Sequence, residues 1–215
     1  MAAPGRIVEI GSFRGRSTIV LRRAAAPGIE LVAIDPHGGG DRGPREIGAD
    51  AARGDADHEA FHANLRAAGV EADVRHVRRP SQDALGDVQA PHDLLYVDGA
   101  HRYRPARADI ERWGDRTAPG GTMLVHDAYN AVGVMLAQLW LLVPSSRWRY
   151  LGRTRSLAEY RREDLSGADR LRNAARQLGD LPYFVRNGLI KLALVLRLRG
   201  LARRLGLADG DEWPY

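Results

Sequence analysis

Cysteine is absent from the 215-residue chain, which excludes a disulfide framework, a cysteine nucleophile and a thiolate-bound metal. The absence is also compatible with a reducing compartment. The first residues, MAAPGRIVEIGSF, lack the apolar core of a signal peptide. No apolar run approaches the roughly 20 residues that cross a membrane. We therefore expect a cytoplasmic protein.

Lysine is almost absent, since Lys191 is the only lysine among 32 basic residues. The formal net charge of +5 is unevenly spread. Residues 1–146 carry 17 basic and 19 acidic side chains, whereas residues 147–207 carry 15 basic and 5 acidic ones. Hydrophobic residues make up 44% and charged residues 27% of the chain, which are globular proportions. These values favour one domain with a basic C-terminal appendage.

Strand-like and helix-like segments alternate before Pro144. Short apolar runs that suit buried strands occur at Ile7–Ile10, Leu31–Ile34, Val74–Val77, Leu94–Val97 and Met123–Val125. Helix-like segments occur at Ser17–Ala26, Glu59–Ala68, Tyr103–Trp113 and Ala131–Val143. Such alternation predicts βαβ units on a doubly wound parallel sheet. After Pro144, two further short strands are expected at Trp148–Leu151 and Ser156–Tyr160.

Polar or glycine-rich residues follow four of the five apolar runs. They are Glu9–Gly15 (EIGSFRG), Asp35–His37 (DPH), Asp98–His101 (DGAH) and His126–Asp127 (HD). Ligands of a parallel α/β sheet bind beyond the carboxyl ends of its strands. The sequence therefore predicts a functional site at that edge.

The glycines of the first turn stand in the pattern Glu9-x-Gly11-x-x-x-Gly15. A glycine-rich turn between a strand and a helix lets a ligand approach the backbone closely. The spacing does not match the G-x-G-x-x-G fingerprint of dinucleotide binding. An acidic residue before the turn suits a cationic ligand, and Asp35 is placed to accept hydrogen bonds from a ribose diol. A purely structural turn is the alternative.

Residues 38–57 are rich in Gly, Asp and Arg and show no periodicity. A loop of this length in a compact domain is usually functional or disordered. It follows the second expected strand, so it either folds over the ligand crevice as a lid or is a floppy insertion.

The end of the chain spaces leucines among basic residues over Tyr183–Leu207, after a helix-like segment at Asp169–Leu178. This pattern predicts a basic amphipathic helix with a break at Gly200. We expect it first to pack as a lid or homodimer element, because its leucine spacing requires a buried partner. Peripheral contact with an anionic membrane surface ranks second. Nucleic-acid binding ranks last, because no recognised binding module is present.

Four stretches of the sequence resemble one family: VEIGSFRGRS, AIDPH, DLLYVDGAHRY and APGGTMLVHD. They look like class I S-adenosylmethionine-dependent methyltransferases, and more narrowly like the small O-methyltransferases that include metal-dependent sugar O-methyltransferases. The specific part is the string D-G-x-H-x-Y…W…P-G-G…H-D. The resemblance implies a Rossmann-like, mostly parallel seven-stranded sheet closed by an antiparallel hairpin. It places a methyltransferase domain at residues 1–162 and a helical C-terminal extension at 163–215.

The resemblance also implies a cofactor site for S-adenosylmethionine. Gly11 and Gly15 would flank the methionine part, with Glu9 nearby, and Asp35 would hold the ribose hydroxyls. Residues after the third strand would lie near the adenine. The full implied set is Glu9, Gly11, Ser12, Gly15, Ser17, Asp35, Ser81, Gln82 and Asp98.

A divalent cation such as Mg²⁺ is implied beside that cofactor, held by Asp98, His126 and Asp127. Asp98 and His101 would be the catalytic residues, with His101 as the general base. This division of labour suits the chemistry, because a bound cation lowers the pKa of an alcohol and a histidine titrates near neutrality. Two alternatives stay open: the aspartates only cap the following helices, and His101 is only a structural donor. Ala128 stands where catechol-type relatives have an Asn, which leaves a third protein ligand open.

The function that follows from these observations is methylation of a hydroxyl on a sugar or oligosaccharide. A saccharide is preferred to a catechol because aromatic residues make up only 7% of the chain and few are available to sandwich a flat ring. The alternatives are a phenolic or small-molecule O-methyltransferase and a non-catalytic cofactor-binding protein with an interacting tail. A nicotinamide-binding protein is a distant further alternative.

Overall fold

The computed structural model describes residues 5–41 and 48–207. Within them, one sheet of seven strands has the order β3-β2-β1-β4-β5-β7-β6. β1 to β5 run parallel, and β7 is antiparallel to both of its neighbours. The strands are β1 (Arg6–Ile10), β2 (Glu30–Ile34), β3 (Val74–Val77), β4 (His92–Val97), β5 (Thr117–Val125), β6 (Trp148–Thr154) and β7 (Leu157–Arg162). The predicted doubly wound, mostly parallel α/β sheet of seven strands is thereby confirmed.

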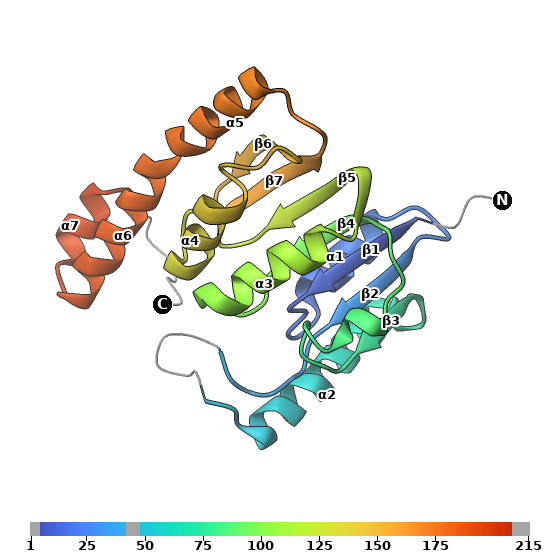
Figure 1. Ribbon diagram of the computed structural model, residues 1–215. Helices are drawn as coiled ribbons and strands as arrows, with labels where there is room; N and C mark the ends of the chain where they lie inside the picture. The colour runs from blue at the N-terminus through green and yellow to red at the C-terminus, as the bar shows by residue number, and fades with distance from the viewer. Residues whose placement is uncertain (1–4, 42–47, 208–215) are drawn as a thin grey trace.

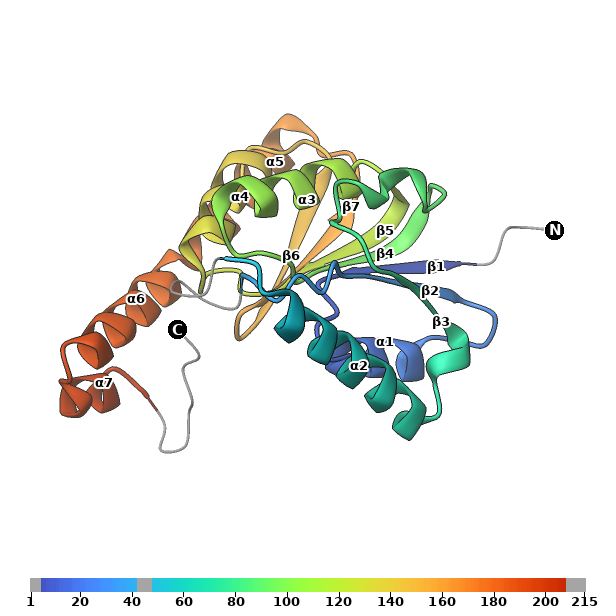
Figure 2. The same ribbon diagram turned by 90° about the horizontal axis from the view of Figure 1, so that it is seen from below.

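Helices cover both faces of the sheet (Figure 1). Seen edge-on, α1 and α2 lie on one face and α3, α4 and α5 on the other, while α6 and α7 project beyond one end (Figure 2). The helices are α1 (Arg16–Ala24), α2 (Ala51–Ala68), α3 (Tyr103–Gly114), α4 (Val132–Leu141), α5 (Gly167–Gly179), α6 (Leu181–Val195) and α7 (Arg199–Arg204). Two short 3₁₀ turns occupy Glu71–Asp73 and Ala84–Gly86. None of the helices in the described ranges has both the length and the apolar character that a membrane crossing requires.

The central strands are buried on both faces, which explains their continuous apolar runs. The last four residues of β1 and of β2 are all buried. β1 pairs with β2 on one side and with β4 on the other. The chain order therefore reverses beside β1, and such a switch point is where α/β sheets bind ligands.

The hairpin of β6 and β7 closes the sheet over a buried polar cluster. The hydroxyl of Tyr160 accepts a hydrogen bond from Gln138 Nε2 (2.8 Å) and donates one to Gln177 Oε1 (3.3 Å). All three side chains are buried. On the neighbouring strand, the backbone N–H of Tyr150 donates to Asn173 of α5 (2.7 Å). Helix α5 is thus tied to the sheet by hydrogen bonds to its two buried residues, Asn173 and Gln177.

Helix α2 begins at Ala51, eight residues before the start expected from the sequence. The predicted loop at 38–57 is wrong over its last part, and its residues 42–47 lie outside the described residues. The side chain of Asp50 caps the helix by accepting from the Arg53 N–H (3.1 Å). Helical spacing is present in the buried set Gly54, Asp57, Phe61 and Leu65. A glycine and an aspartate occupy the first two of these positions, so the apolar pattern does not reveal the helix there.

The basic tail forms two helices rather than one, and the expected break at Gly200 is wrong. α6 ends at Val195, and Arg197 takes a left-handed φ of 59° in the turn before α7, which contains Gly200. The N–H of Leu198 closes this turn on the carbonyl of Ala193 (2.7 Å). α7 then packs its buried Ala202 against α6. The last residues of the extension, 208–215, lie outside the described residues.

Replacement of Tyr160 by phenylalanine tests the polar cluster under the hairpin. Tyr160→Phe leaves the Gln138 amide and the Gln177 carbonyl buried without this partner, so the free energy of unfolding should fall by about 2 kcal/mol. The measurement is equilibrium urea unfolding. Tyr183→Phe is the matched control, since the described residues offer the Tyr183 hydroxyl no hydrogen bond, and it should change the value by less than about 0.5 kcal/mol. Equal effects of the two variants would contradict the assignment.

Candidate functional site

The turns that follow β1, β2, β4 and β5 meet at one edge of the sheet, as the sequence predicts. The turn after β1 lies directly on the turn after β4. The N–H of Asp98 donates to the carbonyl of Ile10 (2.8 Å), and the N–H of Gly11 donates to the carbonyl of Ile34 (2.9 Å). A Cβ at Gly11 would lie 2.1 Å from the carbonyl oxygen of Asp98, and its φ of 84° is left-handed. Only glycine fits this position.

Glu9 is buried directly beneath that turn, where burial raises its pKa to about 7. The hydroxyl of Thr18 donates to Glu9 Oε2 (2.5 Å), and Ser17 also favours the ionised form. Neither contact offsets the loss of hydration. Glu9 Oε1 and the hydroxyl of the neighbouring Ser12 are buried and make no hydrogen bond within the described residues. These two atoms can therefore bind a ligand that brings positive charge and hydrogen-bond donors.

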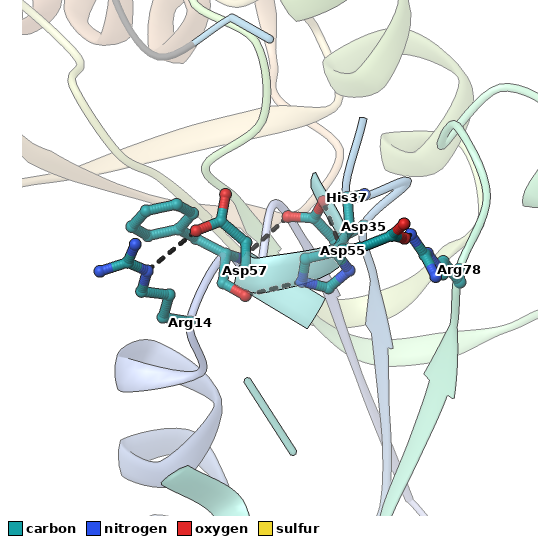
Figure 3. Close-up of polar contacts among 7 residues, drawn as sticks. Arg14, Asp35, His37, Asp55, Asp57 and Arg78 are labelled. Carbon is teal, nitrogen blue, oxygen red and sulfur yellow. Dashed lines mark hydrogen bonds and ion pairs between the residues drawn. The ribbon is translucent and has the colours of Figure 1, made fainter. Parts of the chain in front are cut away.

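Asp35 organises the loops after β1 and β2. One carboxylate oxygen accepts from the Phe13 N–H (2.8 Å) and the other from the His37 N–H (2.7 Å). A ring nitrogen of His37 is 2.8 Å from the carbonyl of Phe13. Figure 3 shows Asp35 and His37 side by side, flanked by the Arg14–Asp57 and Asp55–Arg78 pairs. Each carboxylate oxygen keeps further acceptor capacity, so the ribose contact of Asp35 stays a prediction.

Ser81 and Gln82 lie after β3 and converge on Asp109 of α3, a residue that the sequence analysis did not single out. The Ser81 hydroxyl and the Gln82 amide both donate to Asp109 Oδ1, at 2.5 and 2.7 Å. Burial raises the pKa of Asp109 to about 6 despite these bonds. The Oε1 atom of Gln82 is buried without a hydrogen bond among the described residues. The cluster thus holds the Gln82 side chain in place and leaves its Oε1 atom as an acceptor for a ligand.

Two aspartates and two histidines gather where β4 and β5 end. His101 Nε2 lies 3.1 Å from Asp127 Oδ2 and 3.7 Å from Asp98 Oδ1. His126 Nδ1 lies 3.1 Å from Asp98 Oδ1 and 3.8 Å from Asp127 Oδ2. The structure therefore brings together all the predicted catalytic and metal-ligating residues. Asp98, His101 and Asp127 each offer a ligand atom within 4.8 Å of the others.

Electrostatic coupling in this cluster is strong. The carboxylates of Asp127 and Asp98 raise the pKa of His126 to about 10. Burial opposes ionisation of Asp127, but the nearby His126 ring, a hydrogen bond from Asn130 and the charge of His101 outweigh it, so the pKa falls to about 2. Asp127 is thus anionic at neutral pH, and both carboxylates lie beside histidine rings. A divalent cation with oxygen ligands fits the same place.

Helix α6 of the C-terminal extension contacts the loop that carries Asp127, and the sequence did not predict this contact. Asp127 has a left-handed φ of 51°, and its Oδ1 accepts from the Asn130 amide (2.9 Å). From α6, Lys191 Nζ donates to the carbonyl of Asn130 (2.9 Å) and the Asn187 amide to that of Tyr129 (3.3 Å). Burial lowers the pKa of Lys191 against the opposing charge of Asp127. The one sequence feature that could have indicated this contact is Lys191, the only lysine of the chain.

A model of the methyltransferase domain family matches residues 8–128, and the chain belongs to this family. It is similar to the catechol O-methyltransferase of Mycobacterium tuberculosis, with 29% identity over 134 residues that cover 62% of this chain and 52% of the relative. The chain spans about half the length, or less, of the curated relatives it matches.

Two solved structures share the fold. The O-methyltransferase NovP is 18% identical, with a TM-score of 0.59 and coverage of 75% of this chain and 73% of that one. An O-methyltransferase from Bacillus cereus in complex with SAH (S-adenosylhomocysteine) is 17% identical, with a TM-score of 0.51 and coverage of 72% and 71%. At these identities the likeness establishes the architecture alone.

Replacement of Glu9 by glutamine tests the buried carboxyl group. Because folding raises its pKa from 4.5 to about 7, its contribution to stability is fully present below pH 4.5 and is lost as the pH rises through about 7. Glu9→Gln should gain stability over the wild type by about 3 kcal/mol between roughly pH 4 and pH 8. Urea unfolding across this range measures the difference.

The matched control is Glu111→Gln, which changes an exposed carboxylate on α3. Its difference from the wild type should not vary with pH. Parallel stability profiles for the wild type and Glu9→Gln would contradict the burial of an ionisable group at this site.

Proposed function

We propose that this protein is an S-adenosylmethionine-dependent O-methyltransferase that methylates a hydroxyl of a sugar or oligosaccharide with the help of a divalent cation. One observation carries the proposal. A turn suited to a cationic ligand, over Glu9 and Gly11, shares an edge and a backbone contact with the cluster of Asp98, His101 and Asp127. Methyl transfer needs donor and acceptor held in line at close range, and the backbone contact between the turn and the cluster supports such an arrangement.

The residues present fit the cofactor. S-adenosylmethionine carries a sulfonium and an ammonium group, and Glu9 offers a buried carboxyl whose Oε1 lacks a partner among the described residues. Ser12 Oγ and Gln82 Oε1 are two further buried polar atoms that lack a hydrogen-bond partner among the described residues. Gly15 and Ser17 belong to the same turn and helix start, and Asp35 holds that turn in place. When bound, the cofactor supplies an electrophilic methyl group.

The residues at the ends of β4 and β5 also fit a cation, which would lower the pKa of the acceptor hydroxyl. Asp98 and Asp127 would be its carboxylate ligands, with His126 beside them. His101 would take the proton of the acceptor hydroxyl on a ring nitrogen. Asp127, 3.1 Å away, orients the His101 ring. Asn130 and Lys191 would act as positioning residues, because they hold the loop that carries Asp127.

A sugar acceptor is favoured by the polar character of the site, whose clustered side chains are carboxylates and imidazoles. A catechol or another phenol is the second candidate, and the identity with a catechol O-methyltransferase favours it. Both acceptors can present a vicinal diol to a cation. A panel of glycosides and catechols, assayed with and without EDTA, distinguishes them.

The predicted homodimer and the predicted peripheral membrane contact remain predictions. Large apolar side chains are exposed on α4 (Val132, Leu136 and Trp140) and on α6 (Val185, Leu189, Leu192 and Val195). Sedimentation of the purified chain would decide the oligomeric state, and co-sedimentation with anionic vesicles would test the membrane contact.

Replacement of Asp127 by asparagine separates cation binding from cofactor binding. Asp127→Asn should lower methyl transfer at least about 100-fold, because a carboxylate ligand and the orientation of His101 are both lost. S-adenosylhomocysteine affinity, measured by calorimetry, should change less than about threefold, because the bonds between the β1 turn and β4 remain. Asp115→Asn, at an exposed carboxylate paired with Arg147, is the control and should retain turnover.

Two outcomes would overturn the proposal. If S-adenosylhomocysteine does not bind the wild type with or without Mg²⁺, the chain is not a methyltransferase of this kind. Unchanged turnover in Asp127→Asn would remove the cation from the mechanism.

A further inference from the structure

Four of the seven histidines lie together on the other side of the β1 turn, away from Asp98 and Asp127. His58 and His62 come from α2, His76 from β3 and His37 from the loop after β2. Ring centroids are 4.7 Å apart for His58 and His62, 5.3 Å for His58 and His76, and 5.4 Å for His62 and His76. The proposed function uses none of His58, His62 and His76.

We propose that His58, His62 and His76 bind a divalent transition-metal ion of the Zn²⁺ type. Each ring offers one nitrogen, and the three nitrogens lie within 4.8 Å of one another. His58 and His62 are four residues apart, so one face of α2 presents both rings. β3, the edge strand beside β2, presents the third.

One unsatisfied polar atom of the cluster points to a ligand here. His76 Nε2 is buried and has no hydrogen-bond partner among the described residues. Neutral imidazole is the form that binds metals. Consistent with this, burial and the neighbouring histidines lower the pKa of His76 to about 3 and also lower that of His58.

A carboxylate behind the cluster completes a recognised metal-site arrangement. Glu71 Oε1 lies 2.8 Å from His62 Nδ1, which leaves Nε2 of that ring for an ion. Metal-bound histidines commonly use their other ring nitrogen in this way, and the carboxylate fixes the ring and raises its basicity. Glu71 also pairs with Arg66 (3.0 Å). Glu71 would therefore be a positioning residue rather than a ligand.

The chemistry of the donors separates this site from the carboxylate cluster. Three imidazoles suit Zn²⁺, Co²⁺, Ni²⁺ or Cu²⁺, whereas Mg²⁺ prefers oxygen. Three histidines and a water would make a tetrahedral zinc site. Nitrogens bound to one ion would lie roughly 3.3 Å apart, and rotation of these half-buried rings about their side-chain torsions would supply any closer approach that the ion requires. The charge of Arg78 acts on His58, and Asp55 pairs with Arg78.

The position of the cluster gives the ion a structural consequence. His37 packs its ring 5.3 Å from that of His58 and 5.1 Å from that of His76. The same residue holds Asp35 through its N–H and contacts the Phe13 carbonyl, as Figure 3 shows for Asp35 and His37. α2 approaches so closely that a Cβ at Gly54 would lie 2.0 Å from the His37 carbonyl oxygen. A bound ion would clamp α2 to β3 beneath the β1 turn.

The experiment adds Zn²⁺, and Co²⁺ as a spectroscopic probe, to the full chain after treatment with EDTA and dialysis. The wild type should bind one Zn²⁺ at this cluster, show the visible bands of tetrahedral Co²⁺ and gain thermal stability. His62→Gln and His76→Gln should each lower Zn²⁺ affinity at least about 100-fold, and Glu71→Gln about 10- to 100-fold. Circular dichroism without metal checks that each variant folds.

His101→Gln is the matched control, because it removes a histidine from the other cluster. It should keep the Co²⁺ bands and the Zn²⁺ affinity within about twofold. Absence of Zn²⁺ binding and of Co²⁺ bands in the wild type would overturn the proposal and leave four packed histidine rings. Binding that survives both His62→Gln and His76→Gln but is lost in His101→Gln would overturn it as well. S-adenosylhomocysteine plays no part in these assays, so the proposed function can fail independently.

Discussion

The contact between the turn after β1 and the end of β4 is the constraint on which the rest of the site depends. Gly11 is pressed against the carbonyl of Asp98 so closely that no side chain fits, and the Asp98 N–H is bonded to Ile10. This places the buried carboxyl of Glu9 on one side of a shared backbone and the Asp98 side chain on the other. The turn that we propose for the cofactor and the carboxylate cluster that we propose for the acceptor are thereby adjacent, because two parallel strands are neighbours at the switch point.

The buried carboxyl groups near that contact differ in pKa because their neighbours differ. Glu9 and Asp109 lose hydration without gaining a cationic side chain as partner, so their pKa values rise. Asp127 is also buried, but histidines and an amide compensate it and its pKa falls. The same residue type is therefore prepared for different partners, and the difference lies in what surrounds each carboxyl rather than in the residue itself.

The strand-end residues were predictable because parallel strands align their carboxyl ends, so Glu9, Asp35, Asp98 and Asp127 had to meet at one edge. The first half of α2 was not predictable, because Gly54 and Asp57 occupy buried positions that apolar residues usually fill. The two-helix form of the tail depends on a left-handed turn at Arg197, a residue type that gives no such signal. Asp109 was not predicted because its partners, Ser81 and Gln82, are distant in sequence. Asn130 was not predicted because its contact with Asp127 depends on the left-handed backbone of Asp127.

The sequence by itself determined the alternation of strands and helices, the family and the chemical kinds of side chain at the strand ends, because periodicity and motif spacing are local properties. Only the tertiary structure decided which polar atoms lack a hydrogen-bond partner, which carboxyl groups have a raised pKa, and that Lys191 of the extension supports the loop of Asp127. It also brought His76 beside the two histidines of α2. Burial, electrostatic coupling and contacts between distant segments exist only once the chain has folded.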